Sequence, residues 1–141
     1  MGMRVVDYNA MEQRLVEGIK GSLTALDVVG DESFGVGLRI VPAHSKVPKP
    51  STPFARGRRV LFVLRGSGTI SNGEYYEKLT AGKFVVLDEA EHPHFATQDE
   101  ELMVLEARYD PLGKMAPPAL TVTVPVPEPR PAAKATSYDS I

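Results

Sequence analysis

The chain has no cysteine and no tryptophan, and only three histidines occur in its 141 residues. Without cysteine it cannot form a disulfide scaffold, a zinc finger, an iron–sulfur site or a thiol nucleophile. Its 16 Lys and Arg residues nearly balance its 18 Asp and Glu residues, and the one basic cluster is Arg56–Arg59, which argues against nucleic-acid binding. No apolar run is long enough to span a membrane, and the N-terminus lacks the apolar core of a secretory signal. We therefore expect a cytoplasmic protein that binds neither nucleic acid nor membrane.

Glycine and proline are plentiful, at 12 residues each, and they divide most of the chain into short apolar segments. After residue 21 these segments are rich in β-branched and aromatic residues, which predicts strands. The predicted strands are Ser22–Val29, Ser33–Val41, Arg58–Arg65, Thr69–Ser71, Tyr75–Leu79, Phe84–Asp88, His94–Thr97, Leu102–Tyr109 and Thr121–Val124. Asn72-Gly73 is typical of a hairpin turn. Strands this short and this close together predict an all-β fold, an antiparallel barrel or sandwich.

One short helix is predicted over residues 10–20, because apolar residues recur there with helical spacing. The apolar residues are Met11, Leu15, Val16 and Ile19. The chain then divides into an N-terminal segment with this helix (1–21), a β-barrel (22–115) and a proline-rich C-terminal extension (116–141). Within the barrel, the proline-rich loop 42–57 has the length of a lid or a binding loop. In the extension, Thr121–Val124 alternates like an edge strand, so we expect the tail to pack on its own barrel or on a partner.

Side-chain alternation predicts which residues face the interior of the barrel. If Leu61 and Val63 face inward, then Arg59 and Arg65 at the ends of the same strand do so as well. These four side chains are therefore expected to line a ligand site or to pack in the core.

Arg39 is expected on the inner face of the strand 33–41, together with two glycines, and can converge there with Arg59. Guanidinium groups bind carboxylate or phosphate in a bidentate manner, so the pair predicts an anionic ligand. Alternatively, both arginines point to solvent or pair with Glu101 or Glu106. Glu106 shares a face with Leu102 and Val104, and if that face is interior it is either the partner of Arg59 or an acid–base group.

The three histidines pose the question of a metal. His92 and His94 lie two residues apart and can share one face, and His44 in the long loop can supply a third ligand. Against a metal site, Pro93 disrupts a regular strand between the first two, and His44 lies far away in the sequence. A half-buried histidine bonded to a backbone carbonyl is the alternative interpretation of His94.

The stretch Arg58–Tyr109 resembles the cupin family of small β-barrels, and the pattern of the family is carried by RRVLFVLRGSGTISNGEYYEKLTAGKFVVLDEAEHPHF, residues 58–95. The resemblance rests on the Gly66-Ser67-Gly68 turn after a strand, on Ala81-Gly82-Lys83 before the next one, and on a histidine, His94, a few residues further on. It implies a cupin-type barrel or jelly roll that pairs as a homodimer. A local run, Leu87-Asp88 before His94-Phe95, is similar to ectoine synthase, as is the passage from the strand 102–109 into Asp110-Pro111-Leu112-Gly113.

The departures from the family pattern concern its metal ligands. Cupins usually carry His-x-His and a Glu in a first motif and a His in a second motif. Here Arg59 stands at the position of the Glu, and the preceding loop offers Lys49, Ser51, Phe54 and Arg56 instead of histidines. Only the second-motif histidine is present, as His94. The resemblance therefore implies a cupin that has lost the usual metal site and has no cofactor.

Taken together, these features predict a small cupin enzyme that moves protons on a small anionic organic molecule without a metal, as in an isomerase, cyclase, dehydratase or lyase. His94, Tyr76 and Glu106 are the expected catalytic residues. The ordinary pKa of a histidine suits proton transfer near neutral pH. Tyr76 is included because one of Tyr75 and Tyr76 faces inward if their strand is regular. Arg39, Arg59, Leu61 and Val63 are the expected substrate-binding residues. Two alternatives stay open: a non-catalytic small-molecule-binding module, and a metal-dependent cupin that uses His44, His92 and His94.

Overall fold

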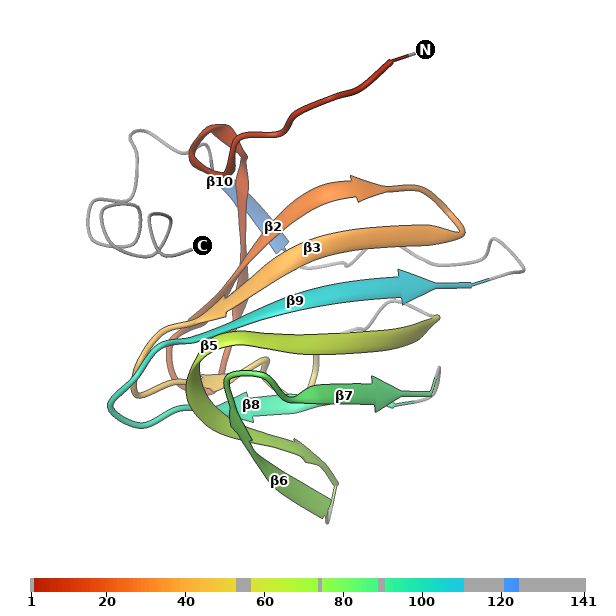
Figure 1. Cartoon of the computed structure of the whole chain (residues 1–141). Coiled ribbons are helices and arrows are strands. Elements are labelled where there is room, and N and C mark those ends of the chain that lie inside the picture. The colour runs from red at the N-terminus through yellow and green to blue at the C-terminus, as the bar shows by residue number, and fades with distance from the viewer. Residues whose placement is uncertain (1, 53–56, 74, 89–90, 111–120, 125–141) are drawn as a thin grey trace.

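The computed structural model describes residues 2–52, 57–73, 75–88, 91–110 and 121–124, which form a nearly closed antiparallel β-barrel (Figure 1). The elements are a 3₁₀ helix η1 (Tyr8–Ala10) and the strands β1 (Gln13–Glu17), β2 (Ser22–Gly30), β3 (Phe34–Val41), β4 (Lys46–Val47), β5 (Arg58–Asn72), β6 (Tyr75–Thr80), β7 (Phe84–Leu87), β8 (His94–Ala96), β9 (Leu102–Tyr109) and β10 (Thr121–Val124). The predicted all-β antiparallel barrel is thus confirmed. In the described part of the chain, no helix has the length and apolar character needed to cross a membrane.

The strands are hydrogen-bonded in the order β10-β1-β2-β3-β9-β5-β8-β4, and β6 and β7 also pair with β5. Every one of these pairings is antiparallel. An isolated bridge between Lys20, just after β1, and Lys46 on β4 brings the far end of this order back toward its beginning. The sheet also takes in β1 and β10, which lie before and after the segment 22–115.

Strand β5 is the longest strand and serves both parts of the barrel wall. Its first half pairs with β9 and β7, and its second half pairs with β6 and β8. The change of partners occurs at Gly66, which has a φ of +86°, and where a Cβ would collide with the carbonyl of Glu101. Only glycine meets both requirements. At the far end of β5, Asn72 pairs with Tyr75 across the hairpin predicted at Asn72-Gly73.

The prediction of a helix over residues 10–20 is wrong. Residues 8–10 form the single turn of η1, whose N-cap is Asp7, and residues 13–17 form strand β1. β1 pairs with β2 on one side and with β10 on the other, so the hydrogen bonds of its backbone are made across strands. The helical spacing of the apolar residues is a coincidence that pairing with two neighbouring strands overrides, as local patterns are weak against tertiary contacts.

Apolar side chains pack on both faces of the sheet. The larger cluster fills the barrel interior and includes Leu61, Leu102, Val104 and Phe95. A smaller cluster of Met11, Leu26, Ile40 and Met103 lies on the outer face, with Tyr8 of η1 packed against it. The N-terminal segment therefore covers part of the outer face of β2, β3 and β9.

The long loop and the C-terminal extension are partly described. In the loop 42–57, the side chain of Thr97 donates a hydrogen bond to the carbonyl of Pro42 at 2.5 Å, and the Lys49 ammonium lies 2.8 Å from Glu17. These contacts fasten the described part of the loop to the barrel wall. As predicted, Thr121–Val124 adds to the sheet edge, as β10 beside β1. Residues 53–56, 111–120 and 125–141 of these segments lie outside the described residues.

Candidate functional site

The interior of the barrel changes from apolar to charged at a similar level on β3, β5 and β9. The apolar half includes Val41, Val63, Leu102 and Val104, and the charged half is formed by Arg39, Arg59, Glu106 and Arg108. The strand register brings the charged residues together, because Gly37 of β3 lies opposite Glu106 and Arg59 of β5 lies opposite Arg108. One end of the barrel is therefore sealed by hydrocarbon, and the other end presents charge.

Glu106 is the centre of this charged end. Its Oε2 atom lies 3.3 Å from Nη2 of Arg39 and 3.5 Å from Nε of Arg108. Arg39 in turn contacts Asp27 at 3.3 Å, and Asp27 lies 2.6 Å from Arg14. The side chains of Arg39 and Glu106 are each only 10% exposed, so this is a largely desolvated network in which burial strengthens each charge–charge contact.

The two interior glycines of β3 make room for guanidinium groups. A Cβ on Gly37 would lie 2.7 Å from Nη1 of Arg39 and 2.8 Å from the carbonyl oxygen of Leu26, and a Cβ on Gly35 would lie 3.2 Å from Nη2 of Arg108. Arginine side chains from the same strand and its neighbour thus lie over the glycines. The space that the glycines leave is occupied in part by the protein's own positive charges.

Arg59 is buried beside this network and has few partners. Its Nη2 donates a hydrogen bond of 2.5 Å to the carbonyl of Glu91, and its Nε is buried without a hydrogen-bond partner in the described part of the chain. Burial is the largest cause that lowers the pKa of Arg59; the charge of Glu106 opposes this shift, whereas Arg108 and Arg39 add to it. Burial likewise lowers the pKa of Arg108. Among the described residues, the charged end therefore holds more guanidinium groups than carboxylates.

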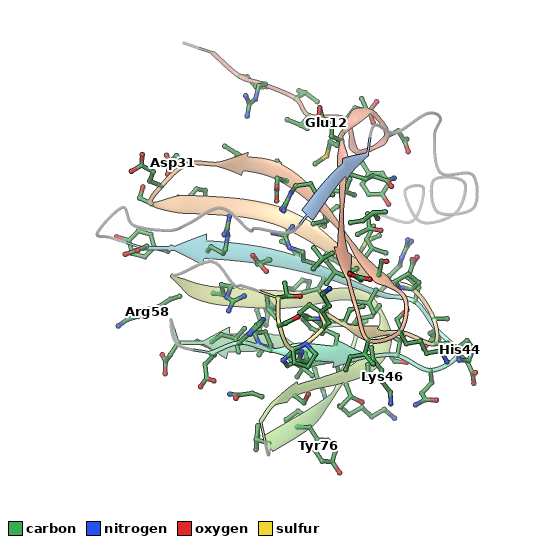
Figure 2. The ribbon with its side chains drawn as sticks, turned by 180° about the vertical axis from the view of Figure 1, so that it is seen from behind. Glu12, Asp31, His44, Lys46, Arg58 and Tyr76 are labelled. Carbon is green, nitrogen blue, oxygen red and sulfur yellow. The ribbon has the colours of Figure 1, made fainter. Side chains whose placement is uncertain are left out.

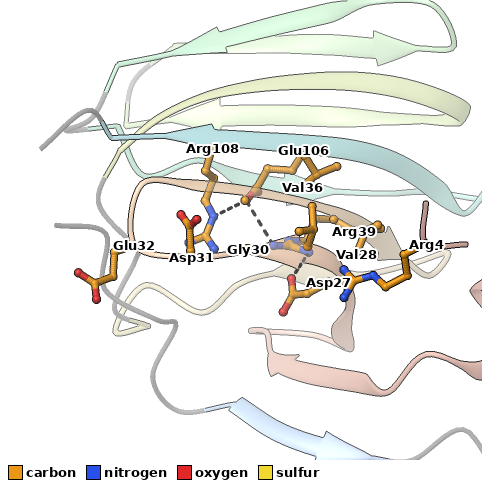
Figure 3. A pocket seen from close by; sticks show the side chains of 13 residues that line it. Arg4, Asp27, Val28, Gly30, Asp31, Glu32, Val36, Arg39, Glu106 and Arg108 are labelled. Carbon is orange, nitrogen blue, oxygen red and sulfur yellow. Dashed lines mark hydrogen bonds and ion pairs between the residues drawn. The ribbon is translucent and has the colours of Figure 1, made fainter. Parts of the chain in front are cut away.

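A cavity of about 640 Å³ opens onto this network (Figure 3). Arg39, Arg108 and Glu106 form its floor, and Asp27 lies beside Arg39. The turn between β2 and β3 forms its rim, where Asp31 accepts hydrogen bonds from the backbone of Ser33 and Phe34. This volume is within the range of small-molecule sites.

Leu61 and Val63 lie on the inner face of β5, as the alternation predicts, and both belong to the apolar core. Arg65 does not follow them, so its predicted inward orientation is wrong. A β-bulge between Val63 and Arg65 shifts the register and turns Arg65 toward Glu101, at 3.4 Å near the surface. Arg59 lies before the bulge and keeps the inner face.

Neither tyrosine of β6 faces inward, so this prediction is also wrong. Tyr75 is 64% exposed and Tyr76 is 71% exposed. The reason is that β6 and the second half of β5 form a hairpin that projects from the barrel wall (Figure 1), and both tyrosines lie at its tip, whereas Leu79 nearer its base is buried in the core. Figure 2 shows Tyr76 on this arm.

His92 lies in the connection between β7 and β8, His94 is the first residue of β8, and His44 lies in the long loop. Nδ1 of His94 lies 3.0 Å from the carbonyl of Pro48, so it donates that hydrogen bond in the neutral ring, and the neighbouring Phe95 takes the core position on β8. The His92 ring lies 5.0 Å from that of His94. Burial lowers the pKa of His92, and the charges of His94 and Arg59 lower it further. The charge of Arg59 therefore reaches His92.

The residues do not fit the metal that cupins usually hold. Arg59 stands where the family's Glu ligand would be, and a guanidinium has no lone pair to offer a metal. In the part of the chain that the structure describes, no group of three or more His, Asp and Glu side chains is arranged to hold a metal ion. His44, with a side chain that is 60% exposed, contacts Asp99 at 3.6 Å instead of joining His92 and His94.

Three residues of the network, Arg108, Asp27 and Arg14, are absent from the sequence-based site. Arg108 follows Glu106 on the same face of β9, so extending the alternation by two residues identifies it. Asp27 is harder to predict, because its contact with Arg39 depends on the pairing of β2 with β3, which places Asp27 opposite Gly37. Alternation alone does not show which acid meets which arginine.

Solved structures with this arrangement of strands are cupins. A cupin-like protein from Thermotoga maritima aligns with a TM-score of 0.58 over 75% of this chain and 77% of its own, at 19% identity. The chain has the cupin fold. The polyketide cyclase RemF from Streptomyces resistomycificus aligns with a TM-score of 0.63 at 15% identity, over 89% of this chain and 86% of its own. A predicted oxalate decarboxylase from Thermotoga maritima reaches the same score and identity over 75% of this chain and 98% of its own. No protein-family model and no curated protein sequence matches the chain.

Proposed function

We propose that this cupin is an enzyme that acts on a small anionic organic molecule by proton transfer in the charged end of its barrel. The observation that carries the proposal is the difference in contacts between the two carboxylate oxygens of Glu106. Both of its ion pairs are made by Oε2, so that atom is anchored between Arg39 and Arg108. Oε1 makes no hydrogen bond with the described residues and belongs to a side chain that lines the cavity. A carboxylate with one oxygen anchored and the other available is oriented for proton exchange with a ligand.

The ligand's negative charge is expected near the same two arginines. Arg39 and Arg108 line the cavity, and each has nitrogen atoms beyond the one that holds Glu106. Guanidinium forks bind carboxylates with two parallel hydrogen bonds, and they do so more strongly where water is excluded. Guanidinium groups that hold the carboxylate also stabilise the negative charge that forms when the C–H bond next to it loses its proton.

The proposed chemistry needs no electron transfer and is assigned to this chain's own side chains. Isomerisation moves a proton from one carbon to another, and cyclisation forms a bond at a carbon that has lost its proton. Dehydration and other lyase reactions remove a proton from one carbon while the leaving group departs from the next. Each of these reactions therefore needs an acid–base group. The structural neighbour RemF is described as a polyketide cyclase, which supports an enzyme of this general kind on the same fold. Glu106 would exchange the proton, while Arg39 and Arg108 would hold the substrate.

The test is proton exchange in deuterium oxide. The protein, dialysed against a chelator, is incubated with a panel of 2-hydroxy-, 2-keto- and unsaturated carboxylates, and NMR follows the loss of C–H signals and the appearance of products. We expect at least one substrate to react, and Glu106→Gln to slow that reaction about 10²- to 10⁴-fold, the usual contribution of an acid–base group, while Kd changes little. Arg39→Gln should raise Kd instead.

Glu101→Gln is the matched control, because Glu101 lies on the outside against Arg65. Substrate binding without any exchange or turnover would contradict catalysis and favour a non-catalytic binding module. Turnover that disappears on chelation and returns with one first-row metal would favour a metal-dependent cupin.

A further inference from the structure

The outer face of the strands β3, β9, β5 and β7 is apolar, although it points away from the barrel interior. These four strands lie side by side in one sheet (Figure 1). Because Arg59 and Arg108 point inward, their neighbours along the strands point outward. The outward residues are Phe34, Val36, Leu38 and Ile40 on β3, Met103, Leu105, Ala107 and Tyr109 on β9, Arg58, Val60 and Phe62 on β5, and Phe84 and Val86 on β7. Solvated faces of antiparallel sheets are usually polar, so this composition indicates a face that another surface covers.

The N-terminal segment covers only one part of this face. Met11 packs against Ile40 and Met103, at the end of β3 and β9 away from the charged rim. On the rest of the face, five side chains remain substantially exposed: Phe34 (42%), Val60 (42%), Phe84 (68%), Val86 (76%) and Tyr109 (55%). We call these five residues the outer patch.

The residues of the outer patch are neighbours on adjacent strands. Phe34 lies opposite Tyr109, and Val60 lies opposite Val86. Tyr109 is opposite the first residue of β5 and therefore diagonal to Val60, within reach of a large side chain. The ring of Phe84 lies 4.5 Å from that of the outward Phe62. The outer patch is thus one continuous apolar surface.

The area of the outer patch matches what one partner of a stable dimer needs. The five side chains leave roughly 500 Å² open to solvent, since a whole aromatic residue presents about 200 Å². The largest apolar patch on a monomeric protein is about 300–600 Å². Each partner of a standard interface buries about 800 Å², of which a little more than half is apolar. The outer patch alone therefore supplies the apolar share of such an interface.

The border of the outer patch carries charges of both signs. Arg58 begins β5 and Asp88 follows β7, and both side chains are exposed. In a two-fold symmetric contact the same surface meets itself, so that residue i of one copy meets residue j of the other and j meets i. A second copy can therefore offer an acid to Arg58 and a base to Asp88, around an apolar centre, as in protein interfaces generally.

We infer that the outer patch is the interface through which two copies of this chain form a two-fold symmetric dimer, with their sheets packed face to face. The inference goes beyond the proposed function and does not rest on it. The residues of the outer patch lie on the opposite side of the sheet from Arg39 and Glu106. The dimer contact therefore lies on the back of the wall whose inner side forms the charged end.

The first test is the mass of the full chain by light scattering at about 100 μM, where we expect a dimer. Val60→Lys places a charge inside the outer patch of both copies and should raise the dissociation constant at least 100-fold, because like charges meet there without water. Val86→Lys makes the same change from β7, should Val60→Lys fail to fold. Tyr76→Lys is the matched control, because Tyr76 is 71% exposed on β6, outside this face, and should leave the dimer intact.

The absence of cysteine from the chain provides a second measurement. Val86→Cys and Tyr76→Cys each introduce a single thiol, at residues of similar exposure, 76% and 71%. At the same protein concentration, we expect a maleimide to react at least tenfold more slowly with Val86→Cys than with Tyr76→Cys. Adding Val60→Lys to Val86→Cys should restore the rapid reaction.

The two measurements together separate the possible occupants of the outer patch. A dimer with rapid reaction of Val86→Cys would place the dimer contact on another surface. A monomer with slow reaction would mean that the chain's own residues, outside the described ranges, cover the outer patch. A monomer with rapid reaction would leave the outer patch to a different protein. Each of these three results would overturn the inference, whereas a dimer whose protection Val60→Lys removes would support it.

Discussion

The two ends of the barrel interior are made by the same strands and yet have opposite chemistry. On β9, Leu102 and Val104 pack in the apolar half, and Glu106 and Arg108 follow on the same face. On β5, Leu61 lies in the core, and Arg59 two residues earlier lies among charges. The change takes one step of the side-chain alternation, so the boundary between the halves is sharp.

The difference shows that the apolar half stabilises the fold and that the charged half costs stability. The apolar half stabilises the fold by burying hydrocarbon, at roughly 25 cal/mol per Å² removed from water. The charged half has to desolvate several arginines, and a buried ion pair rarely gains more than its desolvation costs. A barrel selected for stability alone would continue the hydrocarbon to the rim. The charged end is therefore the part of the interior that ligand binding explains better than folding does.

The largest effect is expected from removing the shared carboxylate. In Glu106→Ala, Arg39 and Arg108 lose their common partner while they stay buried, and breaking such a pair costs about 3–5 kcal/mol. Urea denaturation at constant ionic strength measures this loss. The matched variant Glu101→Ala breaks an ion pair with Arg65 that is partly exposed, and should cost about 0–1 kcal/mol. Equal losses in the two variants would mean that the charged end is not desolvated.

The apolar half is tested by Leu102→Ala. Leu102 is fully buried, and truncating such a leucine costs about 2–5 kcal/mol, depending on how far the cavity collapses. Because Leu102 is two alternation steps from Glu106, we expect the affinity for an anionic ligand to change by less than a factor of three. A large loss of ligand affinity at temperatures where the variant is folded would show that the two halves are mechanically coupled.

The boundary between the halves is tested at Gly37. In Gly37→Ala the new methyl group would approach both Arg39 Nη1 and the Leu26 carbonyl, and the backbone oxygen cannot move aside easily. Overpacking of this kind costs about 1–3 kcal/mol, and displacement of Arg39 should weaken anion binding as well. Gly30→Ala on β2 is the control, because a Cβ there meets its nearest atom at 3.5 Å, an ordinary contact. Thermal unfolding that is identical in the two variants would contradict the close packing of Arg39 over the glycine.

Much of the fold and part of the site could be predicted from the sequence, because both depend on alternation within single strands. That pattern places Leu61, Val63 and Arg59 on the inner face of β5, where the structure has them. It fails at Arg65, because a bulge adds a residue without leaving a sequence signature. It also fails at Tyr75 and Tyr76, because the hairpin extends beyond the wall that an inner face requires.

The network itself could not be predicted, because it depends on which strands become neighbours. Glu106 meets Arg39 only because β9 inserts between β3 and β5, which are distant from it in the sequence. The same reason explains why the segment 10–20 does not form the predicted helix. Strand β1 is held as a strand by β2 and by β10, and β10 lies more than 100 residues further along the chain. Pairing between distant segments decides both the element and the site.

The smallest effect concerns the response of the charged end to acid. Burial, His94 and Arg59 all lower the pKa of His92, so the unfolded chain binds a proton there more readily than the folded chain does. The contribution of His92 to stability is therefore complete above the ordinary histidine pKa of about 6.5, and decreases as the pH falls below it toward the folded-state value. Because carboxylates titrate in acid as well, the measurement is the difference in unfolding free energy between the unmodified chain and His92→Gln, from pH 8 to pH 5. We expect the unmodified chain to lose more stability than His92→Gln over this range. Parallel curves would show that His92 does not feel the guanidinium of Arg59, and that the excess positive charge stops short of the β7–β8 connection.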